Sequence, residues 1–81
     1  MGMQILCNYM YHDEATVTYA FGAALGDITG VIKFNLADGS YEIIKWPEKT
    51  EVCPIVFRKL CSKYRTDFAN RIFRDKIAFQ S

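Results

Sequence analysis

The stretch ITGVIKFNLADGSYEIIKW, residues 28–46, decides the fold. Apolar and polar residues alternate on both sides of its central ADGS, which is the pattern of a strand with one buried face. Asp38-Gly39 is typical of a hairpin turn because glycine adopts a positive φ without steric cost. The stretch therefore predicts an antiparallel β-hairpin.

The register of this hairpin stays open at the level of sequence. A two-residue loop would pair Phe34 with Ile43, whereas a three-residue loop with a bulge would pair Ile32 with Ile44. A slip of one residue exchanges the two faces of a strand, so the choice decides which side chains are buried.

Two further strands are expected upstream. TVTYAF, residues 16–21, alternates between two faces and is rich in β-branched and aromatic residues. A helix over residues 14–25 is the alternative, with Asp13 as its cap and Gly26 at its end. We favour the strand because TVTY is a run of four weak helix formers. QILCNYMY, residues 4–11, is short, apolar and aromatic, and also predicts a strand.

Three glycines spaced four apart lie in FGAALGDITG, residues 21–30. The segment lacks the lysine and hydroxyl residue of a phosphate-binding loop, and it is not the Gly-x-Gly-x-x-Gly of a dinucleotide site. We expect Gly22 and Gly26 to shape a loop between strands, and Gly30 to leave room for an aromatic ring. Leu25, at an apolar loop tip, is a candidate contact for a partner.

An amphipathic helix is predicted from Pro54, because proline suits the first helical turn. Its apolar positions recur at spacings of three and four: Phe57, Leu60, Cys61, Tyr64 and Phe68. The phase drifts after Phe68, where the helix either bends or gives way to a second segment. We assign the helix to residues 54–74 and leave residues 75–81 as a tail that either docks as a strand or remains loose.

The predicted fold class is α+β, a single domain over residues 1–81. It comprises an antiparallel three- to four-stranded β-meander in residues 1–47, a connection at 48–53, and one C-terminal amphipathic helix packed on one face. The expected core consists of Val17, Tyr19, Phe21, Ile28, Ile32, Phe34, Ile43, Phe57, Leu60, Tyr64 and Phe68.

Composition points to self-association and to a cytoplasmic protein. A chain of 81 residues that is 51% hydrophobic and 15% aromatic cannot easily bury all its rings, so a homodimer is expected. No stretch is apolar enough to cross a membrane, and no signal peptide is recognisable. Three cysteines at wide spacings favour buried thiols in a reducing compartment.

Catalytic and metal-binding constellations are not apparent. His12 is the only histidine, and adjacent residues in HDE, 12–14, point in different directions along a strand or turn. Cys7, Cys53 and Cys61 form no Cys-x-x-Cys pair, so a zinc site would lack ligands. The prediction is a protein that is not an enzyme and binds no metal or cofactor.

Charge divides the chain into two halves. Residues 1–53 carry a net charge of −4 and residues 54–81 a net charge of +5. Such asymmetry indicates an electrostatic partner. The basic residues that could meet a polyanion are Arg58, Lys59, Lys63, Arg65, Arg71 and Arg74.

Two functional hypotheses follow. The first is a small non-enzymatic protein-interaction module that self-associates, with Tyr9, Tyr11 and Leu25 as candidate contacts with a partner protein. The alternative is nucleic-acid binding through the basic face of the helix, which would weaken steeply with salt. An acidic sheet disfavours insertion of the strands into a DNA groove, so only the helix remains for that role.

Overall fold

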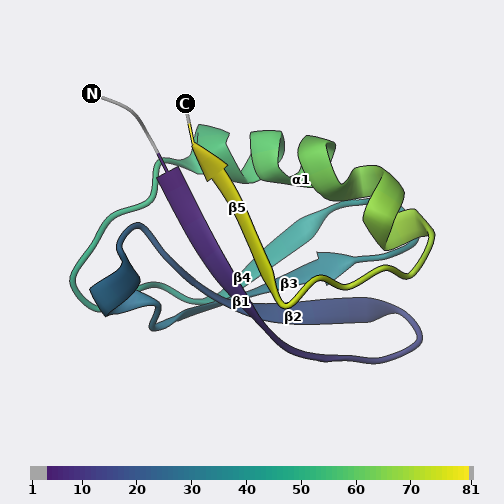
Figure 1. The fold of residues 1–81 in the computed structure, drawn as a ribbon, viewed down its shortest axis with the longest axis horizontal. Coiled ribbons are helices and arrows are strands. Elements are labelled where there is room, and N and C mark those ends of the chain that lie inside the picture. The colour runs from purple at the N-terminus through teal and green to yellow at the C-terminus, as the bar shows by residue number, and fades with distance from the viewer. Residues whose placement is uncertain (1–3, 81) are drawn as a thin grey trace.

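A five-stranded antiparallel sheet with one helix across a single face forms the protein (Figure 1). The computed structural model describes residues 4–80. The strands follow the order β4-β3-β2-β1-β5 across the sheet. The elements are β1 (Gln4–His12), β2 (Thr16–Gly22), the short 3-10 helix η1 (Leu25–Asp27), β3 (Gly30–Asn35), β4 (Tyr41–Lys45), α1 (Pro54–Ala69) and β5 (Lys76–Gln80).

The α+β class and the antiparallel sheet are confirmed, but the helix is not C-terminal. The first four strands form the predicted meander, and the tail adds a fifth strand, β5, beside β1. Ile77 of β5 is buried in the core, which gives this short strand an apolar anchor. Gln4 pairs with Gln80, so the two ends of the described chain lie side by side (Figure 1). Residues 1–3 and 81, included in the predicted ranges, lie outside the described residues.

The helix ends at Ala69, so the predicted extension to residue 74 is wrong. Arg71 has a φ of 58°, and its N–H donates to the carbonyl of Phe68 at 3.0 Å. The N–H of Ile72 donates to the carbonyl of Asp67 at 2.8 Å. These two bonds are the Schellman ending of a helix, in which glycine usually occupies the position that Arg71 takes here.

The hairpin register differs from both predicted registers. Ile32 pairs with Ile43 and Phe34 with Tyr41, because the loop spans residues 36–40. Polar side chains stabilise this longer loop: the Asn35 carboxamide accepts from the N–H of Ala37, and the Asp38 carboxylate accepts from the N–H of Ser40. Such side chain-to-backbone bonds replace the tight turn that Asp38-Gly39 predicted.

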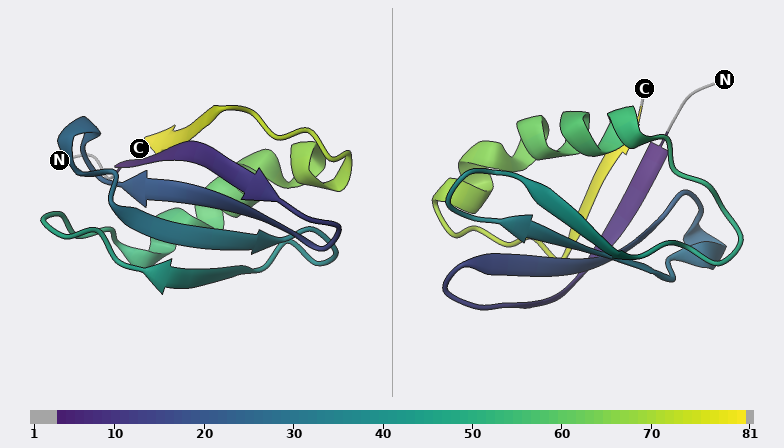
Figure 2. Two further views of the ribbon diagram at one scale, coloured as in Figure 1. Left: turned by 90° about the horizontal axis from the view of Figure 1, so that it is seen from below. Right: turned by 180° about the vertical axis from the view of Figure 1, so that it is seen from behind.

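The core lies between α1 and one face of the sheet, which the helix crosses (Figure 2). Most of the predicted core residues are buried there, although Ile28, Ile43 and Tyr64 are only half-buried. A bulge between Tyr9 and Tyr11 breaks the alternation of β1, so these two tyrosines do not share a face. The buried hydrophobic residues that lie outside the predicted core set are Ile5, Cys7, Val52, Val56 and Ile77.

The connection from β2 to β3 depends on a buried carboxylate. Asp27 is 4% exposed, and its Oδ2 accepts hydrogen bonds from the backbone N–H groups of Lys49 and Thr50, at 2.8 and 2.6 Å. The hydroxyl of Thr50 also donates to Oδ2, and that of Thr29 donates to Oδ1. Burial alone would raise the pKa of Asp27, but these donated bonds outweigh it and lower the pKa to about 2.

Candidate functional site

The middle of one sheet edge, at Ala78 of β5, is covered by side chains of the helix. Among residues 4–80 no strand lies beyond β5, yet both outward backbone groups of Ala78 have partners. The Tyr64 hydroxyl lies 3.3 Å from both the N and the O of Ala78, and Lys63 Nζ donates to the same carbonyl at 3.0 Å. An edge strand whose backbone groups are occupied in this way is a poor template for another strand.

Removal of the Tyr64 hydroxyl is expected to uncover this edge. In Tyr64→Phe the N–H of Ala78 loses its acceptor, while the ring keeps its packing against Phe68. We expect the rate of amide exchange at Ala78 to rise about fivefold, which is the change expected from loss of one modest hydrogen bond. NMR-detected hydrogen exchange measures it, with the amide of Ile77 as the internal reference. Unchanged exchange at Ala78 would mean that the hydroxyl does not protect this edge.

The opposite edge, β4, has no such cover. The N–H of Asn35 donates to the carbonyl of Ser40, and hydrogen-bonded pairs alternate along an antiparallel ladder. The backbone N–H and C=O groups of Glu42 therefore point toward β3. Those of Tyr41 and Ile43 point away from the sheet. Within residues 4–80, no strand, loop or side chain bonds to these outward groups. We call this side of β4 the open edge.

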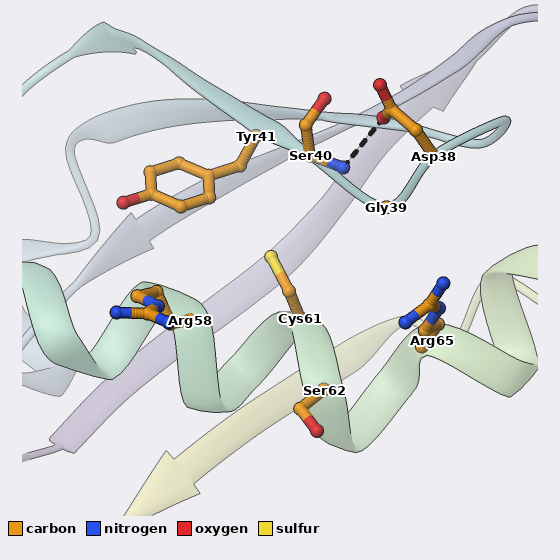
Figure 3. Close-up of a pocket in the computed structure, with 8 residues that line it drawn as sticks. All are labelled: Asp38, Gly39, Ser40, Tyr41, Arg58, Cys61, Ser62 and Arg65. Atoms are coloured by element: carbon orange, nitrogen blue, oxygen red, sulfur yellow. Dashed lines mark hydrogen bonds between the residues drawn. The ribbon is translucent and has the colours of Figure 1, made fainter.

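A groove lies between α1 and the loop that leads into β4, with Tyr41 as the β4 residue in its lining (Figure 3). It has a volume of about 350 Å³ and is lined by Asp38, Gly39, Ser40, Tyr41, Arg58, Cys61, Ser62 and Arg65. Arg58 and Arg65 stand near its two ends on the helix, and the sulfur of Cys61 points between them toward β4. The Tyr41 ring packs against Phe57 with ring centres 5.1 Å apart, which fixes the β4 wall against the core.

The groove presents positive charge to solvent. In the part of the chain that the structure describes, the ion pairs join Lys45 to Glu48 and Arg74 to Asp67, so neither Arg58 nor Arg65 is neutralised by a carboxylate. The acidic residue in the lining is Asp38, whose bonds from the side chain and backbone of Ser40 lower its pKa and keep it ionised. Burial raises the pKa of Cys61 to about 11, so its thiol stays protonated near neutral pH and is not a ready nucleophile.

The six basic residues proposed for a polyanion site do not form one surface. Arg58 and Arg65 line the groove, whereas Lys59 and Lys63 lie on the other flank of α1, over β5. Arg71 donates to the carbonyls of Asp13 and Glu14, and Arg74 pairs with Asp67 at 2.8 Å. Two of the six thus converge on a concave surface, and two are engaged in holding the fold.

The three proposed partner contacts are also separated. Leu25 is 84% exposed and Tyr11 is 56% exposed, but they lie near opposite ends of β1. Tyr9 is half-buried: its ring stacks on Phe73, and its hydroxyl bonds to His12 at 2.6 Å. These residues form no common patch, and Tyr9 belongs to the packing of the core margin.

The surroundings of His12 and Cys7 limit their chemistry, whereas Cys53 is exposed, contrary to the expectation of buried thiols. His12 bonds to the Tyr9 hydroxyl and lies against the Phe73 ring, with centres 4.4 Å apart. Burial raises the pKa of Cys7, so its thiol is held in the protonated form. No group of three His, Cys, Asp or Glu side chains among residues 4–80 is placed to hold a metal ion.

The groove combines two arginines that have no acidic partner among the described residues with the start of the open edge. Comparison with protein-family models, with curated proteins and with solved structures finds no match to this chain. Within residues 4–80, no helix has the length and apolar character needed to cross a membrane. Arg58 and Arg65 are predictable from the sequence as basic residues, but the groove is not, since their meeting with Ser40 and Tyr41 depends on the hairpin register and on the rotation of α1.

Proposed function

We propose that this protein is a non-enzymatic protein-interaction module that takes up an extended segment of a partner along the open edge of β4. The partner segment adds a sixth strand through backbone hydrogen bonds to Tyr41 and Ile43. Its alternate side chains then point into the groove beside α1. Addition of a strand to a free sheet edge is a common way to recognise peptides, in which pockets beside the edge give specificity.

The observation that carries this proposal is the difference between the two edges. Tyr64 and Lys63 occupy the outward groups of Ala78 on β5. The corresponding groups on β4 have no partner within residues 4–80, and a groove lined by Tyr41 opens at the start of this strand. A sheet whose β5 edge is blocked at its central residue and whose β4 edge is unoccupied next to a concave surface is suited to a partner at β4.

A proline at the open edge tests the proposal. Ile43→Pro removes an N–H that points away from β3, so the sheet keeps its own ladder while the edge loses a donor. Ile43→Ala is the matched control, because it removes the same side chain and keeps the N–H. The probes are peptides selected from a displayed library of random twelve-residue sequences, with binding measured by fluorescence anisotropy.

We expect selected peptides to bind the wild type and Ile43→Ala with similar affinity. They should bind Ile43→Pro at least about tenfold more weakly, because the proline removes a backbone hydrogen bond and its ring blocks the edge. On binding, the amides of Tyr41 and Ile43 should become protected from exchange. Equal binding to the proline and alanine variants, or a library that yields no binder, would overturn the proposal.

A second copy of the chain is the other occupant that the open edge could take. Pairing of two β4 strands would give the homodimer expected from the aromatic composition. Sedimentation velocity between about 1 and 100 μM separates the cases. A dimer that forms in Ile43→Ala and not in Ile43→Pro would replace the partner segment by a second copy. Nucleic-acid binding is the weaker proposal, because the exposed cations of α1 lie on two flanks.

A further inference from the structure

We infer that the groove selects an acidic segment with the pattern acidic-x-apolar-x-acidic, its two carboxylates bound by Arg58 and Arg65. This inference rests on the proposed function and adds the chemistry of the partner to it. It assigns the groove to aspartate or glutamate side chains of a peptide in extended conformation.

The spacing of the two arginines sets the pattern. They are seven residues apart on one flank of α1, which places their Cα atoms about 10.5 Å apart along the axis. Along a strand, residues on the same side are separated by about 7 Å at i, i+2 and about 13 Å at i, i+4. Two arginine side chains reach carboxylates at i and i+4 by diverging slightly, because about 13 Å along the strand exceeds about 10.5 Å along the helix. The residue at i+2 then lies between them.

The middle of the groove is suited to an apolar side chain. Cys61 is half-buried with a protonated thiol, and its sulfur points into the space between the arginines (Figure 3). The Tyr41 ring forms the facing wall and packs on Phe57. A small or medium apolar side chain at i+2 would cover these groups without leaving a polar atom buried and unpartnered.

Charge favours carboxylates at the two outer positions. Arg58 and Arg65 have no acidic partner among the described residues, so a bound carboxylate does not compete with an existing ion pair. Asp38 is the acidic residue of the groove and lies on the wall that faces Arg65. The two walls are close here, because a Cβ built on the neighbouring Gly39 would lie 4.0 Å from Arg65 Cγ. Asp38 should therefore weaken acidic ligands, and Asp38→Asn should strengthen them while its amide oxygen still accepts from Ser40.

The test compares two synthetic peptides with Glu-x-Val-x-Glu or Gln-x-Val-x-Gln cores on the same framework. Anisotropy is measured at about 50 and 200 mM salt. The variant is the double substitution Arg58→Gln and Arg65→Gln. The matched control is Lys59→Gln with Lys76→Gln, which removes the same charge from exposed positions outside the groove lining.

We expect the glutamate peptide to bind the wild type about tenfold more tightly at low salt, the sum of two partly exposed ion pairs. In the arginine variant the two peptides should bind about equally. In the lysine control the preference should persist, and in the wild type it should shrink at the higher salt. Equal binding of the two peptides to the wild type, or an equal loss of preference in both double variants, would overturn the inference.

Failure of this inference is distinguishable from failure of the proposed function. If both peptides bind equally and both lose affinity for Ile43→Pro, strand addition stands and the acidic preference is wrong. If the glutamate peptide binds Ile43→Pro as tightly as it binds Ile43→Ala, the arginines bind carboxylates without the open edge, and the proposed function fails. A twelve-nucleotide single strand that binds more tightly than the glutamate peptide, through the same arginines, would reassign the groove to nucleic acid and overturn the inference.

Discussion

Gly22→Ala is expected to destabilise the protein by about 3 kcal/mol or more, which corresponds to a fall in Tm of about 15 °C. Gly22 is the last residue of β2, and the backbone of Asp27 returns to pack directly against it. A Cβ at this position would overlap the carbonyl oxygen of Asp27 and lie 2.8 Å from its carbonyl carbon. Both obstacles are backbone atoms, so no side-chain rotation relieves the overlap.

Gly26→Ala is the matched control for this prediction. Gly26 lies in the same loop, and a Cβ there meets nothing within 4 Å. Its φ is outside the positive region, so alanine adopts the same backbone conformation. We expect a change of no more than about 0.5 kcal/mol in the free energy of unfolding, measured by urea titration followed by circular dichroism. Equal stability of the two variants would show that β2 and η1 are not held as closely as the structure places them.

The sequence predicted the elements whose signal is local. The hairpin residues alternate with period two, and the apolar positions of the helix repeat every three or four residues, so both elements were identified from short windows. The strand at residues 16–21 was favoured over a helix by local propensity, because TVTY is a run of four weak helix formers. These signals arise from burial of one face, and the five-stranded sheet with its covering helix buries those faces.

The sequence could not predict features that depend on distant residues. β5 is only five residues long, and its partner β1 begins more than 70 residues earlier in the chain. The helix ends at a Schellman turn that carries arginine at the position where glycine would have been the signal. The hairpin register depends on bonds made by Asn35 and Asp38, which lengthen the loop.

The groove was missed for the same reason. Arg58 and Arg65 were recognised as basic, but their separation from Lys59 and Lys63 follows from the rotation of α1 about its axis relative to the sheet. The open edge exists because β5 pairs with β1 and the polypeptide adds no strand beyond β4 among residues 4–80. Neither fact has a signature in the residues that line the groove.

Asp27→Ala is the second substitution expected to have a large effect. The side chain joins η1 to the segment after β4, because it accepts from the backbone N–H groups of Lys49 and Thr50. Alanine would leave these two donors without their acceptor, and a buried donor without a partner is costly. We expect Tm to fall by about 10 °C. Asp27→Asn keeps the shape and one accepting oxygen, so its Tm should lie between those of the wild type and Asp27→Ala.

The same carboxylate makes stability depend on pH in a defined window. Its pKa is lowered from 3.8 to about 2 in the folded protein, so the folded state binds the proton less readily than the unfolded chain. The stability that Asp27 contributes is therefore fully present above pH 3.8 and is lost as the pH falls toward 2.

Asp13 and Asp38 also have lowered pKa values, so some loss of stability in acid should remain in Asp27→Asn. The difference in the free energy of unfolding between the wild type and Asp27→Asn, measured by urea titration from pH 6 to 2, should be constant above about pH 5 and shrink below pH 3.8. A difference that stays constant down to pH 2 would mean that Asp27 titrates alike in the folded and unfolded chains. The hydrogen bonds from Thr29, Lys49 and Thr50 would then not favour its ionised form.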